Sequence, residues 1–135
     1  MEVRQLALFK GARARPAPPK EFALHCALAD LVTRWIMPGW MFTHIPLGEH
    51  RNKATAVRLQ RMGVKPGWPD FIFVGPQRRC FFLELKRRGG SQSDEQANVA
   101  LHVIRSGFDY LCTDNLDEAV AVLRDLGIVR ARVSA

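Results

Sequence analysis

Two short apolar runs, at residues 71–74 and 81–85, lie in the middle of the chain with turn-forming residues between them. A glycine, a proline and two arginines around Gln77 are typical of a tight turn, so the two runs predict a β-hairpin. In an antiparallel pair whose turn is centred near Gln77, the numbers of directly opposite residues sum to about twice 77. This register places Asp70 opposite Glu84.

Apolar residues on both sides of the hairpin recur with helical or extended periods. Capping signals mark three helix starts: Asn52 before a short helix, Ser93 and Gln96 at the spacing of a capping box, and Asn115 or Asp114 before the last helix. In chain order the pattern predicts a helix over 18–37, a strand over 40–46, a helix over 53–62, the hairpin, a helix from 93 to about 106, a strand over 108–112, a helix over 116–126, and a sheet edge or frayed end over 128–135.

Two burial predictions follow from the same pattern. The first helix carries two adjoining apolar stripes, so we expect it to be well buried. The cysteines are odd in number and form no C-x-x-C pair, which argues against zinc or a redox couple and favours small buried hydrophobic residues. The stripes are Phe22, Cys26, Ala29 and Val32 beside Leu24, Leu28, Leu31 and Trp35, and the cysteines are Cys26, Cys80 and Cys112.

Length and charge narrow the class of protein. A chain of 135 residues with 47% hydrophobic composition predicts one domain, over 20–135, behind a flexible basic tail at 1–19. The 20 Lys and Arg exceed the 13 Asp and Glu by seven, which favours nucleic acid as the partner and an anionic membrane as second choice. No apolar run approaches the roughly 20 residues of a membrane span. The amino terminus also lacks the layout of a signal peptide, so we expect a cytosolic protein.

The hairpin register gathers groups that are capable of chemistry. Side chains alternate along a strand, so Lys86 shares a face with Asp70 and Glu84, while Leu83 and Leu85 point the other way. Close carboxylates oppose each other's ionisation, and a hard divalent cation such as Mg²⁺ would relieve that cost. The lysine could then orient or deprotonate a water, or hold a phosphate. The alternative is a turn aspartate beside the solvated face of a half-buried strand.

Three further polar residues allow two interpretations each. Glu21 and His25 are four residues apart and share a helix face. Glu21 suits the first turn of a helix on electrostatic grounds alone, and His25 is either a hydrogen-bonded helix histidine or a metal ligand. Gln96 either closes the capping box or takes part in the site. Basic residues on both sides of the acids are either solvating charges or phosphate contacts: Arg51, Lys53, Arg58, Arg61, Lys65, Arg87 and Arg88.

Four pieces in this order resemble a known family. Gly67-Trp68-Pro69-Asp70, Glu84-Leu85-Lys86, Gly89-Gly90 and Ser93-Asp94-Glu95-Gln96 are together similar to the PD-(D/E)XK nuclease superfamily. Within it they resemble the virus-type replication-repair nuclease (VRR-NUC) domain, in its small stand-alone bacterial and phage versions. The run from Arg51 to Gly67 is similar as well, so the resemblance covers roughly residues 21–126.

The resemblance implies a restriction-endonuclease-like α/β core, with a small mixed sheet around a central hairpin and helices on its flanks. It implies that Asp70, Glu84 and the Leu85 carbonyl hold Mg²⁺ or Mn²⁺, and that an acid on the first helix, here Glu21, reaches the metal. It implies that Lys86 handles the attacking water, with Gln96 in support.

The function expected from residues and resemblance is metal-dependent DNA endonuclease activity. The resemblance further implies a homodimer that acts on branched DNA in the manner of a Holliday-junction resolvase, in the cytoplasm of a bacterial or phage-infected cell. One alternative is a nickase or linear-DNA nuclease without branch preference. Another is a non-catalytic DNA-binding module. A membrane-surface protein fits poorly, because no segment places lysines opposite large apolar groups.

Overall fold

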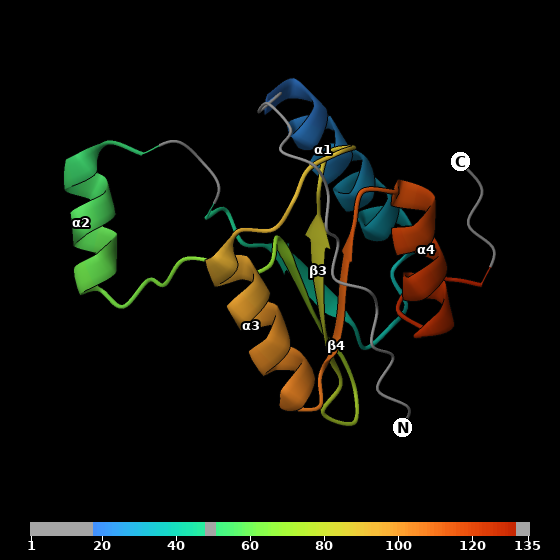
Figure 1. Ribbon diagram of the computed structural model, residues 1–135. Coiled ribbons are helices and arrows are strands. Elements are labelled where there is room, and N and C mark those ends of the chain that lie inside the picture. Colours follow the sequence, from blue (N-terminus) through green and yellow to red (C-terminus); the bar gives the residue numbers. More distant parts are fainter. Residues whose placement is uncertain (1–17, 48–50, 132–135) are drawn as a thin grey trace.

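The computed structural model describes residues 18–47 and 51–131. Within them the chain forms four helices and four strands (Figure 1). Most of the predicted basic tail, residues 1–17, lies outside the described residues, as do residues 48–50 and 132–135. The elements in order are α1 (Pro18–Trp35), β1 (Met41–His44), α2 (Lys53–Arg61), β2 (Phe71–Val74), β3 (Cys80–Leu85), α3 (Asp94–Arg105), β4 (Asp109–Thr113) and α4 (Leu116–Asp125).

The strands form one mixed sheet in the order β1-β2-β3-β4. The first three strands are antiparallel, whereas β4 runs parallel to β3. A parallel neighbour requires a crossover connection, and α3 supplies it. The α/β architecture with a central hairpin is therefore the one expected from the sequence.

The hairpin has the predicted register. Phe71 pairs with Leu83 and Val74 pairs with Cys80, so each pair of numbers sums to twice 77. The turn places Gln77 at φ 59° and its successor Arg78 at φ 62°, two consecutive left-handed residues of the kind that tight hairpins require. The same register, carried one residue beyond β2, sets Asp70 opposite Glu84.

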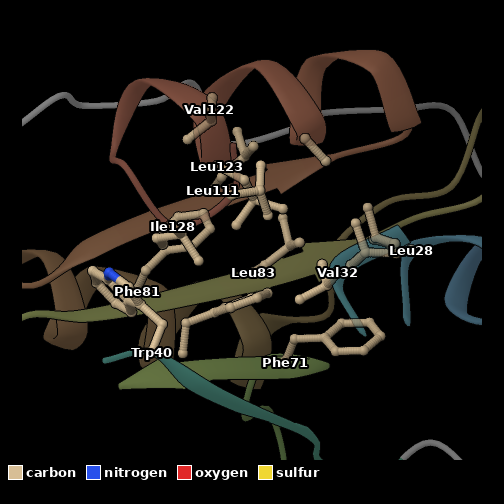
Figure 2. Close-up of a cluster of buried hydrophobic side chains, with 14 residues drawn as sticks. Leu28, Val32, Trp40, Phe71, Phe81, Leu83, Leu111, Val122, Leu123 and Ile128 are labelled. Atoms are coloured by element: carbon tan, nitrogen blue, oxygen red, sulfur yellow. The ribbon is translucent and has the colours of Figure 1, made fainter. Parts of the chain in front are cut away.

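Helices cover both faces of the sheet (Figure 1). On one face α1 and α4 pack against β3 and β4 through Leu28, Val32, Leu83, Leu111 and Leu123, all at most 1% exposed (Figure 2). On the other face α3 packs over a smaller cluster. That cluster contains Phe82, Ala100, Val103, Tyr110 and Cys112.

The prediction that α1 is well buried is wrong for one of its stripes. Leu28 and Val32 are fully buried, but Phe22 is 70% exposed and Cys26 is exposed. The helix lies on a narrow sheet beside α4, so only one side of it meets other described elements. The cysteine prediction fails at Cys26 for the same reason and is confirmed at Cys112, which is buried.

Cys80 lies between these extremes, because it occupies the first position of β3 and is half-buried. Burial raises the pKa of its thiol. The helix α2 contains no buried residue, and its Val57 is 54% exposed. Figure 1 shows this helix standing apart from the sheet.

The segment after α4 does not fray at its start. Ile128 and Val129 are buried, and Val129 forms an antiparallel bridge with Ile36. Neither half of that prediction holds at the start of the segment: within the described residues no sheet edge is added, because Val129 pairs with Ile36 outside the four-stranded sheet. In the described residues no helix combines the length and apolarity needed to cross a lipid bilayer.

Candidate active site

The two predicted acids lie at the open end of the hairpin. Asp70 directly precedes β2. Its backbone carbonyl accepts a hydrogen bond from the Ile45 N–H at 2.6 Å and lies 2.7 Å from Nδ1 of His44. Glu84 is the fifth residue of β3. Lys86 directly follows β3, and its backbone N–H donates to the Thr113 carbonyl at 2.8 Å, so the ladder with β4 continues to this residue.

A glycine sets the approach of the chain to Asp70. Gly67 has φ +91°, and a Cβ there would lie 2.5 Å from the backbone carbon and oxygen of Glu95. The loop that carries Asp70 therefore lies against the first turn of α3. Only glycine combines this backbone angle with this approach.

Asp70 links the two strands of the hairpin and the first helix. Its Oδ2 accepts a hydrogen bond from the Leu85 N–H at 2.8 Å. The same oxygen lies 3.3 Å from Nε2 of His25 on α1, and both side chains are 21% exposed. The carboxylate is thus fixed in place by two elements while it remains reachable from solvent.

Glu84 is the most deeply buried charge of the site, at 1% exposure. Its Oε2 accepts hydrogen bonds from the Tyr110 hydroxyl at 3.0 Å and from Gln92 Nε2 at 3.1 Å. Its Oε1 accepts none and lies 3.5 Å from Nζ of Lys86. The network therefore fixes one oxygen and leaves the other free to act as a ligand.

Burial dominates the protonation of this acid. Burial raises the pKa of Glu84 above its ordinary value, and the charge of Asp70 adds to this rise. The charge of Lys86 and the hydrogen bonds from Gln92 and Tyr110 lower the pKa, but they do not offset the effect of burial. Burial and the charge of Glu84 in turn raise the pKa of Tyr110 far above its usual range. The tyrosine hydroxyl therefore stays protonated and donates a hydrogen bond to Glu84.

Gln96 closes the capping box and also contacts Lys86. Its backbone N–H donates to Ser93 Oγ at 3.2 Å, and its Oε1 accepts from Ser93 N at 2.9 Å, which closes the capping box. The same Oε1 accepts a hydrogen bond from Nζ of Lys86 at 2.9 Å. The cap of α3 thus also holds the lysine of the site.

His25 faces the site from α1. Burial alone would lower its pKa, but the close contact with Asp70 and its charge, the charge of Glu21 and the backbone of Leu85 together raise the pKa above the ordinary value. Glu21 lies one helical turn earlier, and its charge contributes to this rise in the pKa of His25. Among the described residues no three His, Cys, Asp or Glu side chains are gathered into a ready metal cage.

The predicted nucleic-acid contacts remain at the surface, in two groups. The guanidinium of Arg51 donates a hydrogen bond to the Pro46 carbonyl at 2.7 Å. Arg87 is half-buried and Arg88 is exposed, directly after Lys86. The exposed members in and after α2 are Lys53, Arg58, Arg61 and Lys65.

Three polar residues of the site were absent from the sequence-based candidates. Tyr110 pairs with Phe82 in the parallel ladder, so it shares a face with Glu84, but that register follows from packing and from no local signal. Gln92 lies in a loop without a predictive pattern. His44 could have been suspected, because a polar residue ends the apolar strand just before Pro46.

The donor set fits a divalent cation. Within the described residues, His25 Nε2 and Glu84 Oε1 are the buried side-chain polar atoms that lack a hydrogen bond. A buried polar atom without a partner costs about 1–3 kcal/mol. His25 Nε2 lies beside Asp70 and Glu84 Oε1 lies beside Lys86, so a cation held by Asp70 and Glu84 would give each atom a partner.

The similarity of this chain to known proteins lies in its structure and not in its sequence. No family model and no curated protein matches the sequence. A solved structure described as a VRR_NUC domain protein superposes with a TM-score of 0.65 at 18% identity, over 90% of this chain and 100% of that one. The chain therefore has the fold of a VRR_NUC domain protein, which is the fold that its motifs imply.

Proposed function

We propose that the protein is a metal-dependent endonuclease that hydrolyses phosphodiester bonds in DNA. The observation that carries the proposal is the buried Oε1 of Glu84, which accepts no hydrogen bond and lies 3.5 Å from Nζ of Lys86 at the end of the sheet that also carries Asp70. Two acids and an amine form a compact polar site, in a chain with a net charge of +7. The fold, with its likeness to a VRR_NUC domain protein, supports the same class of activity.

Asp70, Glu84 and the Leu85 carbonyl are the groups that would hold Mg²⁺ or Mn²⁺. When bound, such an ion polarises the phosphate and lowers the pKa of a coordinated water. Tyr110 and Gln92 orient Glu84 by fixing its Oε2, so its Oε1 keeps one direction. A side chain that is already held in its binding orientation loses little conformational entropy when it binds the ion.

Lys86 is the group that would position the attacking water. Its Nζ is held between Gln96 Oε1 at 2.9 Å and Glu84 Oε1 at 3.5 Å, and its side chain is 12% exposed. An ammonium fixed in this way can donate to a water or to a phosphate oxygen, where it offsets the negative charge that builds during hydrolysis. Gln96 therefore acts as a positioning residue for Lys86.

The substrate class follows from the charge. The exposed basic residues of α2 and the pair Arg87 and Arg88 can contact the phosphates on either side of the scissile bond. We extend the proposal to branched DNA cut by a homodimer, because the motifs resemble the stand-alone members of the family. A two-fold dimer presents two sites for paired incisions.

Cleavage assays of Asp70→Asn and Glu84→Gln test the activity. We expect each change to lower Mg²⁺-dependent or Mn²⁺-dependent cleavage of DNA by at least about 10²- to 10³-fold, the loss typical of removing one preorganised charge-stabilising group. Asp30→Asn, a matched change at an exposed position of α1, should cleave like the wild type. Full activity in both site variants would reject the proposal.

Substrate shape separates the nuclease alternatives. Nicked, linear, flapped, splayed and four-way DNA should be cut at different rates, with symmetric paired cuts in the four-way junction. Equal rates would leave a nuclease without branch preference. A non-catalytic DNA-binding module would instead show no Mn²⁺ uptake that depends on Asp70.

A further inference from the structure

The ring of His25 is held in a fixed orientation beside the acids. Its centroid lies 5.0 Å from the ring of His44 and 5.6 Å from the ring of Phe71, which it meets edge-on at 90°. Aromatic contacts of this geometry favour one ring position. The imidazole therefore presents its Nε2 in a defined direction.

That direction is toward the groups assigned to the metal. Nε2 is buried and makes no hydrogen bond within the described residues, although it lies 3.3 Å from Asp70 Oδ2. Asp70 Oδ2 already accepts a well-formed hydrogen bond from Leu85 N at 2.8 Å. The interpretation of His25 as a hydrogen-bonded helix histidine does not account for this unsatisfied nitrogen.

The spacing suits two ligands of one ion. Neighbouring ligands of an octahedral ion with bonds of about 2.1 Å lie about 3.0 Å apart. The 3.3 Å between Nε2 and Asp70 Oδ2 is close to that separation. A neutral imidazole in this place offers a nitrogen lone pair where an all-oxygen site would offer water or an amide oxygen.

Nitrogen changes which ion the site favours. Mg²⁺ binds oxygen ligands and keeps much of its water, whereas transition metals accept imidazole readily. We propose that His25 is a direct nitrogen ligand of the catalytic ion, through Nε2, and that it makes the site selective for Mn²⁺ over Mg²⁺. The proposal rests on the metal-dependent activity proposed above and adds a ligand and an order of preference to it.

The first measurement is calorimetric titration of the full chain with MnCl₂ and, separately, with MgCl₂, in the absence of DNA. His25→Gln replaces the nitrogen by an amide oxygen of similar reach. We expect it to lower the ratio of Mn²⁺ to Mg²⁺ affinity by about tenfold or more, since loss of a mere supporting group commonly costs 10- to 100-fold in metal affinity. His102→Gln, at an exposed position of α3, should keep the wild-type ratio.

The second measurement is pulsed electron paramagnetic resonance of bound Mn²⁺, which detects a directly coordinated ¹⁴N. The nitrogen signal should be present in the wild type and in His102→Gln, and lost in His25→Gln. A wild type that takes up Mn²⁺ in an Asp70-dependent way without that signal would overturn the inference but not the proposed function. Absence of any uptake would overturn both.

Two other outcomes count against the inference alone. A higher Mn²⁺ affinity in His25→Gln would show that the imidazole competes with the ion for Asp70 and does not ligate it. A nitrogen signal that survives His25→Gln would assign the ligand to another histidine, with His44 the nearest ring.

Discussion

At the scale of the residue, Glu84 shows a conflict between stability and function. A carboxylate that is 1% exposed and has one oxygen without a hydrogen bond is a costly group for the folded state to hold in its charged form. The rise in its pKa expresses that cost, because the fold favours the protonated acid. The same oxygen, which accepts no hydrogen bond, is what makes the residue suited to bind a cation.

We therefore predict that Glu84→Gln stabilises the metal-free protein near neutral pH, by about 1 kcal/mol or more. Because the pKa of Glu84 is raised in the folded state, the folded protein binds more protons than the unfolded chain between the two pKa values. Wild-type stability should thus fall as pH rises through that window. The advantage of the variant should vanish in acid below the ordinary carboxyl pKa and be complete above the raised one.

Urea denaturation in a chelating buffer, from about pH 4 to about pH 8, measures this difference. Glu95→Gln, at an exposed position in the first turn of α3, is the matched control and should change stability little. A variant less stable than the wild type at neutral pH would contradict the prediction. Saturating Mn²⁺ should reverse the order, since it stabilises the wild type by mass action.

The sequence predicted the residues of the site that a local rule can place. Asp70, Glu84 and Lys86 follow from hairpin register and strand alternation, and the capping box with Gln96 follows from local spacing. Tyr110 and Gln92 could not be placed, because their contacts with Glu84 depend on the parallel pairing of β4 and on a loop conformation. Such features follow from long-range packing.

At the scale of the element, the pattern located helices and strands well and their burial less well. Periodicity and caps placed α3 and α4 with their N-caps at Ser93 and Asn115. The same periodicity overstated the burial of α1, because Phe22 faces a side that no described element covers. A helix has an apolar face by sequence, but whether that face is covered depends on the rest of the fold.

The loop before β2 packs against α3 at Gly67, and Gly107 offers a matched control for a substitution there. Gly67 and Gly107 have nearly the same backbone angle, φ +91° and φ +90°. A Cβ at Gly107 would meet nothing within 4 Å, whereas one at Gly67 would meet the Glu95 backbone at 2.5 Å. Gly107→Ala should cost about 1–2 kcal/mol for the left-handed conformation alone.

Gly67→Ala should cost about 1–3 kcal/mol more than Gly107→Ala, because the loop must also move away from α3. That movement displaces Asp70, so Mn²⁺ affinity should fall in Gly67→Ala and stay unchanged in Gly107→Ala. Chemical denaturation and calorimetry check the two effects. Equal losses of stability would mean that the contact with α3 does not constrain the loop.

At the scale of the whole molecule, α2 stands out because it adds charge without adding core. It has no buried residue, and it lies apart from the sheet in Figure 1. A helix in this position contributes little to folding through tertiary contacts. Its three basic residues, Lys53, Arg58 and Arg61, are all exposed, so we expect α2 to act as a phosphate-binding arm.

The salt dependence of DNA binding tests that expectation. Each phosphate contact contributes about 0.9 to the slope of log affinity against log salt concentration. Replacing Lys53, Arg58 and Arg61 together by glutamine should therefore reduce the slope by up to about 3, while helix propensity is preserved. Fluorescence anisotropy with labelled duplex, in metal-free buffer so that no cleavage occurs, gives the slope directly.

A second triple variant removes the same charge elsewhere. Arg34, Arg105 and Arg124 are exposed arginines in the last turns of α1, α3 and α4. Arg58 and Arg61 have the same place in α2, so the helix-dipole effects are matched for these two residues, whereas Lys53 begins its helix. If DNA lies along α2, this variant keeps most of the wild-type slope although its net charge equals that of the α2 variant. Equal reductions in the two variants would show that the whole basic surface attracts DNA and that α2 has no special part in binding.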